Sequence, residues 1–86
     1  MRYVYVLRSV KSKTLYVGST DNVARRIREH NEGFSKFTRR HVPWQCVYLE
    51  GYAAPEDAYE RESQLKRFQN SFTQLKRRLR HTLGGG

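Results

Sequence analysis

The chain has 86 residues, with 17 lysines and arginines against 8 aspartates and glutamates, which gives a formal net charge of +9. This length fits one domain, and the 37% of hydrophobic residues is too much for a disordered chain. The sequence has no apolar stretch long enough to span a membrane, no signal-peptide pattern and a single cysteine, Cys46. We therefore expect a cytoplasmic protein with no membrane role and no internal disulfide. The positive charge favours a polyanionic partner, although a basic surface that only keeps the protein in solution would give the same excess.

The first segment is predicted to be a β-hairpin. Residues 2–8 carry a run of β-branched and aromatic side chains, and residues 14–18 resume that composition. Residues 10–13 between them are polar and few enough for a tight antiparallel turn.

A helix is expected after the hairpin. Thr20 or Asp21 can cap its start, and Gly33 can end it. Val23 and Ile27 lie four residues apart, so they should form the stripe that faces the core.

A basic, turn-rich connection and a third strand are predicted to follow. The connection covers residues 34–43. Residues 44–52 have strand composition, with apolar and aromatic side chains at their centre.

Two helices are predicted to complete the chain. Pro55 suits the first turn of a helix that should run to about Phe68. The final helix is expected to begin near Asn70 or Ser71, either of which would cap it. Its apolar stripe consists of Phe72, Leu75, Leu79 and Leu83.

The predicted order is strand, strand, helix, strand, helix, helix. This order gives an α+β fold in which a three-stranded antiparallel sheet is flanked by helices. Because no repeat or linker interrupts the pattern, residues 1–83 should form one domain, followed by a flexible glycine tail at residues 84–86.

Glu62 is a candidate metal ligand. It lies four residues after Ala58 and three before Leu65, so it falls on the stripe of its helix that should face the core. Carboxylates avoid such positions unless they are paired or bind a metal. An ion pair with Lys66 at the next turn also explains the position.

The hairpin and the first helix carry a second group of candidates. Arg26 and His30 share one helical face, and Tyr5 and Tyr16 lie on the two strands. Phosphodiester hydrolysis needs a base, positive charge over the phosphate and usually a divalent metal. Arginine can hold a phosphate with two hydrogen bonds, and a tyrosine can act as a base where nearby cations favour its phenolate. The plainer alternatives are a solvated helix face, half-buried sheet tyrosines and, for Gly18, a strand-end turn.

The two tyrosine triplets resemble the motifs that give the GIY-YIG nuclease superfamily its name. They are Tyr3-Val4-Tyr5 and Tyr16-Val17-Gly18, and ten residues separate them. Tyr3 replaces the first glycine of the family name at a position that often varies. Arg26 and His30 match the family's arginine and a histidine common in many members.

The likeness extends over about residues 2–80 and is closest to small, stand-alone bacterial members. The segment at residues 58–66 is similar to the family's metal-binding helix, with Glu62 at the metal position. The family frequently has an asparagine after that helix, and Asn70 is the nearest candidate in this chain. Asn70 is more plainly interpreted as a helix cap.

The resemblance implies a metal-dependent endonuclease that hydrolyses DNA phosphodiester bonds in repair, recombination or other DNA processing. Glu62 would hold one Mg²⁺ or Mn²⁺. Tyr5 would be the general base, and Tyr16 would line the site and help hold the water. Arg26 would bind the scissile phosphate, and His30 would contact phosphate, orient a tyrosine or aid proton transfer.

The substrate is expected to be DNA that is held along basic segments. No separate recognition domain is evident, so specificity would be loose, directed to single strands or DNA structures, or supplied by a protein partner or by self-association. The alternative function is a non-catalytic nucleic-acid-binding module whose aromatic side chains stack on single strands. A protein-interaction adaptor is a third interpretation. The expected substrate contacts are Gly18, Lys36, Arg39, Arg40, Lys66, Lys76 and Arg77.

Overall fold

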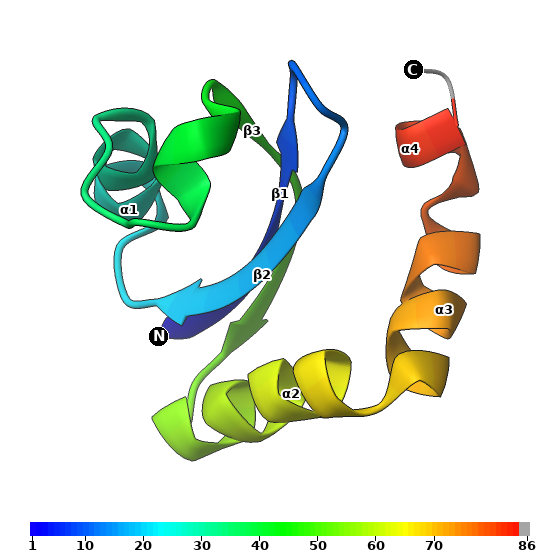
Figure 1. The fold of residues 1–86 in the computed structure, drawn as a ribbon. Helices are drawn as coiled ribbons and strands as arrows, with labels where there is room; N and C mark the ends of the chain where they lie inside the picture. The colour runs from blue at the N-terminus through cyan, green and yellow to red at the C-terminus, as the bar shows by residue number, and fades with distance from the viewer. Residues whose placement is uncertain (85–86) are drawn as a thin grey trace.

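A computed structural model describes residues 1–84 and has the predicted fold class and element order. A three-stranded antiparallel sheet, in the order β2-β1-β3, is flanked by helices on both faces (Figure 1). No helix within these residues is long and apolar enough to cross a membrane. The elements are β1 (Arg2–Ser9), β2 (Leu15–Thr20), α1 (Val23–Asn31), the 3₁₀ helix η1 (Thr38–His41), β3 (Trp44–Tyr52), α2 (Pro55–Arg67), α3 (Gln69–Arg78) and α4 (Arg80–Gly84).

The register of the hairpin places the two tyrosine triplets side by side. Tyr5 of β1 lies opposite Gly18 of β2, and Leu7 lies opposite Tyr16. Because side chains alternate along a strand, Tyr5, Tyr16 and Gly18 share one face of the sheet. The central strand β1 also pairs with β3, where the register shifts by one residue between Val6 and Leu7.

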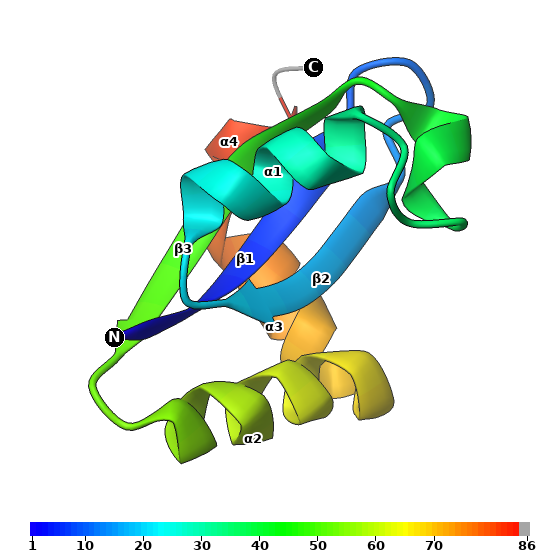
Figure 2. The same ribbon diagram turned by 90° about the vertical axis from the view of Figure 1, so that its left-hand side faces the viewer.

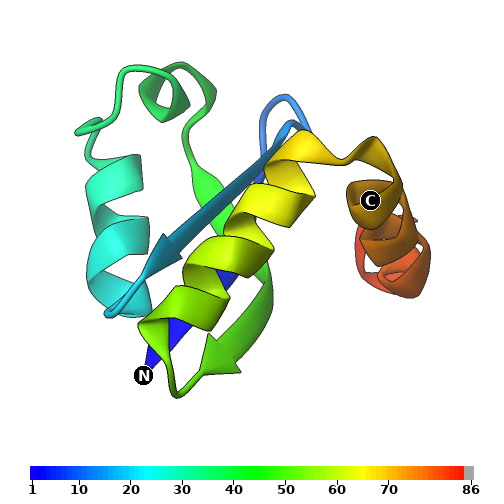
Figure 3. The ribbon, with the colours of Figure 1, turned by 90° about the horizontal axis from the view of Figure 1, so that it is seen from below.

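The core lies in two clusters, one on each face of the sheet. On one face, Val4 and Val6 pack against Leu65 of α2 and Leu75 of α3. Figure 3 shows α1 on one side of the strands and α3 with α4 on the other, with α2 crossing in front of them.

The second cluster contains the buried residues Tyr5, Leu7 and Trp44, with Ile27 of α1 packed against it. Helix α1 runs across this face of the sheet (Figure 2). This face therefore holds aromatic side chains under a helix that carries Arg26 and His30.

The start of α1 differs from the prediction. Asn22 is the N-cap, and its side chain accepts a hydrogen bond from the backbone N–H of Arg25. The Thr20 hydroxyl accepts instead from the backbone N–H of Asn22, which lies before the helix, so Thr20 is not the cap. The predicted end is confirmed: Gly33 follows the helix at φ +85, a conformation that glycine adopts without strain. Ile27 contacts the core as expected.

The last predicted helix is interrupted. It divides at Leu79, whose N–H reaches the carbonyls of both Leu75 and Lys76. The apolar stripe is nevertheless correct, since Leu75 and Leu79 are buried and the other two members pack against the same cluster. The predicted cap was wrong, because α3 follows Phe68, whose carbonyl accepts from the N–H of Ser71. Gly84 belongs to α4 rather than to the predicted tail, whose other two residues lie outside the described part of the chain.

Candidate active site

A buried hydrogen-bonded chain joins β1, α1 and η1. The Tyr5 hydroxyl and His30 Nε2 are 2.9 Å apart, and His30 Nδ1 is 2.8 Å from Thr38 Oγ1. Trp44 Nε1 donates to the Thr38 carbonyl at 2.7 Å, which holds η1 against the sheet. A neutral imidazole has one N–H, so His30 donates one of its two hydrogen bonds and accepts the other. The two hydrogen bonds therefore fix the imidazole against the phenol and against η1.

Burial sets the protonation states of this pair. His30 is fully buried, and its pKa falls from 6.5 to about 4, first because burial disfavours the imidazolium and then because Arg26 is close. Burial likewise raises the pKa of Tyr5, while Arg26 beside its hydroxyl opposes that change. At neutral pH the site therefore holds a neutral imidazole and a neutral phenol. Arg26 is the group that favours the phenolate.

The space above Gly18 is filled by Tyr5. A Cβ atom at position 18 would lie 2.3 Å from the Tyr5 hydroxyl oxygen and 2.5 Å from its Cζ. Glycine is thus needed here so that the Tyr5 ring can cross the neighbouring strand and reach His30. This is a structural reason for the glycine, and a substrate contact at Gly18 stays a prediction.

Tyr16 lies at the centre of an aromatic group. Its ring is edge-on to His30, with centroids 5.1 Å apart, and its centroid is 6.0 Å from that of Phe37. The centroid of the Tyr5 ring is 6.4 Å away. The Lys66 ammonium lies 5.6 Å from the centre of the Tyr16 ring. Tyr16 is half-buried, so it links the buried pair to the surface.

Arg26 carries a guanidinium that is already paired within its own helix. Its Nη1 donates to Glu29 Oε1 at 3.0 Å, and its side chain is 32% exposed. It is close enough to Tyr5 to oppose the rise in pKa that burial causes at that hydroxyl. Arg26 therefore combines a fixed position beside the phenol with donors that remain open to solvent.

Glu62 approaches from α2, which packs on the opposite face of the sheet. Its Oε1 accepts from Ser19 Oγ at 2.9 Å, and its Oε2 pairs with Lys66 Nζ at 2.8 Å. The ion pair that the spacing allowed is therefore present. Arg2 Nε donates to Ser19 Oγ at 3.3 Å and adds a second cation to this group. Strand β2 is an edge strand of the sheet. At this edge the charge of Glu62 is close enough to contribute to the raised pKa of Tyr5.

The chemistry of this carboxylate fits one hydrated divalent ion. The Glu62 side chain is 22% exposed, so its oxygens are held in place and still reach solvent. Magnesium binds through one or two carboxylates and keeps several waters, which a single glutamate can serve. Within residues 1–84 no cluster of three histidine, cysteine or acidic side chains forms a closed cage. A bound ion would share Glu62 with the ammonium of Lys66.

The structure thus brings together Tyr5, Tyr16, Arg26 and His30 on one face, with Glu62 at the adjoining edge. The other expected substrate contacts lie on separate elements, and they stay predictions. Lys36, Arg39 and Arg40 precede or belong to η1, whereas Lys76 and Arg77 belong to α3.

Two residues of this site were absent from the sequence-based prediction. Thr38 is fully buried against His30, although nothing in its sequence surroundings marks it apart from other threonines. Ser19 is bonded to Glu62. Strand alternation could have indicated Ser19, because it shares a face with Val17 and points toward the helix that carries Glu62.

The chain contains a GIY-YIG catalytic domain. The family model with that description matches residues 1–80, so the chain belongs to the GIY-YIG family. Membership indicates a nuclease activity with DNA as the substrate.

Several small proteins are similar to most of the chain. It is 40% identical over 68 residues to a UPF0213 protein of Clostridium perfringens, covering 78% of this chain and 72% of that protein. It is 43% identical over 65 residues to a UPF0213 protein of Natronomonas pharaonis, covering 74% and 75%. A UPF0213 protein of Staphylococcus haemolyticus is 39% identical over 67 residues, covering 77% and 80%. No solved structure matches the chain.

Proposed function

We propose that this protein is a metal-dependent endonuclease that hydrolyses DNA phosphodiester bonds in repair, recombination or other DNA processing. The observation that carries the proposal is the Tyr5–His30 hydrogen bond of 2.9 Å beside Arg26, with Glu62 at the adjacent sheet edge. A base, a phosphate-binding cation and a metal-binding carboxylate are the three parts that this hydrolysis needs.

Tyr5 acts as the general base in this proposal. A buried phenol is a weak base at neutral pH because burial raises its pKa. Arg26 offsets this weakness, since its charge favours the phenolate that takes a proton from the attacking water, while the neutral imidazole of His30 holds the phenol in place through Nε2. Thr38 then holds the imidazole through Nδ1 so that Nε2 faces the phenol. His30 thereby orients Tyr5, and its burial makes a direct phosphate contact the least suited of its expected roles.

Arg26 binds the scissile phosphate. Its guanidinium is partly exposed and sits beside the Tyr5 hydroxyl. It can therefore hold a phosphate oxygen next to the base and offset the charge that develops in the transition state. Glu29 fixes the guanidinium by the ion pair at 3.0 Å.

Glu62 holds one Mg²⁺ or Mn²⁺, with Ser19 fixing the orientation of the carboxylate at 2.9 Å. When bound, such an ion supplies Lewis-acid stabilisation of the phosphate and of the leaving oxygen. Lys66 shares the carboxylate and places a further positive charge near the substrate. DNA specificity is directed to single strands or structures, or comes from a protein partner or self-association.

The proposal is tested by cleavage of labelled single-stranded, duplex and branched DNA with Mg²⁺, Mn²⁺ or EDTA. Glu62→Ala should abolish metal-dependent cutting. Glu60→Gln provides a matched control, because Glu60 is an exposed carboxylate on the same helix. Equal cleavage by wild type and Glu62→Ala, or equal cleavage in EDTA, would rule out the proposed role of Glu62.

A further inference from the structure

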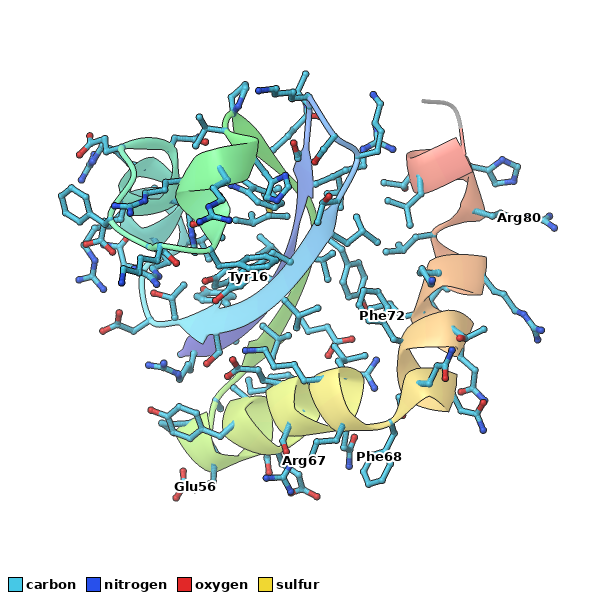
Figure 4. All side chains as sticks on the ribbon, viewed as in Figure 1. Tyr16, Glu56, Arg67, Phe68, Phe72 and Arg80 are labelled. Atoms are coloured by element: carbon cyan, nitrogen blue, oxygen red, sulfur yellow. The ribbon has the colours of Figure 1, made fainter. Side chains whose placement is uncertain are left out.

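An open groove adjoins the active site between β2 and helices α2 and α3. Its volume is about 320 Å³, and three aromatic side chains line it: Tyr16, Phe37 and Phe72. Figure 4 shows Phe72 directed from α3 toward the sheet, whereas Phe68 at the end of α2 points away from it. Phe37 is 55% exposed, so the groove presents an aromatic surface to solvent that folding alone does not require.

Positive charge lies directly over this aromatic surface. The Lys66 ammonium is 5.6 Å from the centre of the Tyr16 ring, and the Lys76 ammonium is 5.4 Å from the centre of the Phe72 ring. Both lysines are exposed. Their flexible stems let the ammonium groups move with a ligand while the ring faces remain in place.

A second groove shares Leu15 with the first. Its volume is about 240 Å³, and its other lining residues are Arg8, Lys13, Lys76 and Leu83, three of which are cations. The aromatic surface and these three cations therefore lie on either side of Leu15. A ligand with a flat apolar ring beside a negatively charged group would match the aromatic groove and the neighbouring cations.

We propose that the aromatic groove is a subsite for one unstacked nucleobase of the strand that is cut, with the neighbouring phosphates lying along Lys13 and Lys76. The role in cleavage rests on the proposed function, whereas the binding of the base does not. A neutral apolar peptide would fill the groove without using these cations. An unpaired nucleotide uses both, through stacking on the rings and through its phosphates.

The groove is joined to the active site by shared residues. Tyr16 contacts His30 on one side and lines the groove on the other. Lys66 lines the groove and also bonds Glu62 at 2.8 Å. A base in the groove therefore lies next to the position of the scissile phosphate. Because a base inside a duplex is stacked and paired, the subsite favours substrates that are single-stranded or locally unpaired at the cut.

The test is binding of short single strands that carry one 2-aminopurine, measured by fluorescence in EDTA so that no cleavage occurs. Phe37→Ala should weaken binding about tenfold and reduce the quenching of 2-aminopurine that stacking produces. Phe34→Ala and Phe68→Ala are matched controls, because both residues are exposed phenylalanines outside the groove. Phe72→Leu is a second groove variant that keeps an apolar side chain at a half-buried position and should also weaken binding.

Equal binding by Phe37→Ala, Phe72→Leu and the two controls would overturn the proposal. So would equal binding of the same strand when it is paired in a duplex. Self-association of the wild type that Phe37→Ala abolishes, without any change in binding of the strand, would assign the groove to a second copy instead. Because the assay contains no metal, weaker binding by the groove variants would stand even if the protein cleaved no DNA. Conversely, metal-dependent cleavage with unchanged binding would reject only the subsite.

Discussion

Gly18→Ala should disable the site although it replaces none of the proposed catalytic residues. The new Cβ would lie 2.3 Å from the Tyr5 hydroxyl oxygen and 2.5 Å from Cζ, distances below any real Cβ contact. The ring must therefore move by a large fraction of an ångström, which breaks its 2.9 Å hydrogen bond to His30. Overpacking of a core costs about 1–3 kcal/mol, and an unsatisfied buried partner costs about 1–3 kcal/mol more. We expect the free energy of unfolding to fall by about 3 kcal/mol.

The assay is urea and thermal denaturation together with single-turnover cleavage. In a domain of this size about 3 kcal/mol corresponds to a decrease of about 12–24 °C in Tm. Displacement of the base by about 1 Å should slow cleavage about 10²-fold even at a temperature where the variant is folded. Gly84→Ala is the control, because nothing lies within 4 Å of a Cβ at that position. Wild-type stability and cleavage in Gly18→Ala would show that Tyr5 does not need the space above Gly18.

Three further predictions concern protonation, positioning and charge. The pKa of His30 is about 4 in the folded chain against 6.5 for an ordinary histidine, so the unfolded chain takes up the proton first as the pH falls. As the pH falls from 7 to 4, His30 should therefore lower the free energy of unfolding by about 3 kcal/mol. Urea titrations of His30→Gln should lack that decrease. The same pH dependence in wild type and His30→Gln would contradict the assigned burial. Thr38→Val leaves His30 Nδ1 without its partner, which should cost about 1–3 kcal/mol of stability and shift the pH profile of cleavage. Thr38→Ser should restore the stability and the pH profile. Failure of serine to restore them would reject the positioning role. Neutralising basic residues of the connection or of α3 should flatten the salt dependence of DNA binding. The slope of log K against log salt concentration should fall by about one for each phosphate that the variant no longer binds. An unchanged slope would show that the segment does not contact DNA. The residues to neutralise are Lys36, Arg39 and Arg40 in the first set, and Lys76 and Arg77 in the second.

Local pattern was enough to predict the sheet and most helices. Alternating β-branched and aromatic residues define the strands, and the predicted bounds 44–52 for the third strand are those observed. Pro55 begins α2 as its fixed φ suggests. Helix caps were less predictable, because Thr20, Asp21 and Asn22 are all suitable caps and the turn that follows β2 decides among them. The break at Leu79 was likewise not predictable, because no proline or glycine lies at that position.

The candidate site was predictable only in part. The spacing of the triplets, Arg26, His30 and Glu62 was visible in the sequence and pointed to the family that the match over residues 1–80 confirms. What no local pattern indicates is that His30 is buried between a tyrosine from β1 and a threonine from η1. These partners are 25 and 8 residues away along the chain, so only the three-dimensional fold joins them. For the same reason no pattern in the sequence indicates that Tyr5 occupies the space above Gly18.

The most direct test of the account is single-turnover cleavage by Tyr5→Phe. The phenylalanine ring keeps the packing above Gly18 and removes only the hydroxyl that pairs with His30. If Tyr5 is the base, cleavage should fall about 10²- to 10⁴-fold while binding of DNA in EDTA stays unchanged. Cleavage at the wild-type rate would contradict the central claim that the Tyr5–His30 pair activates the water.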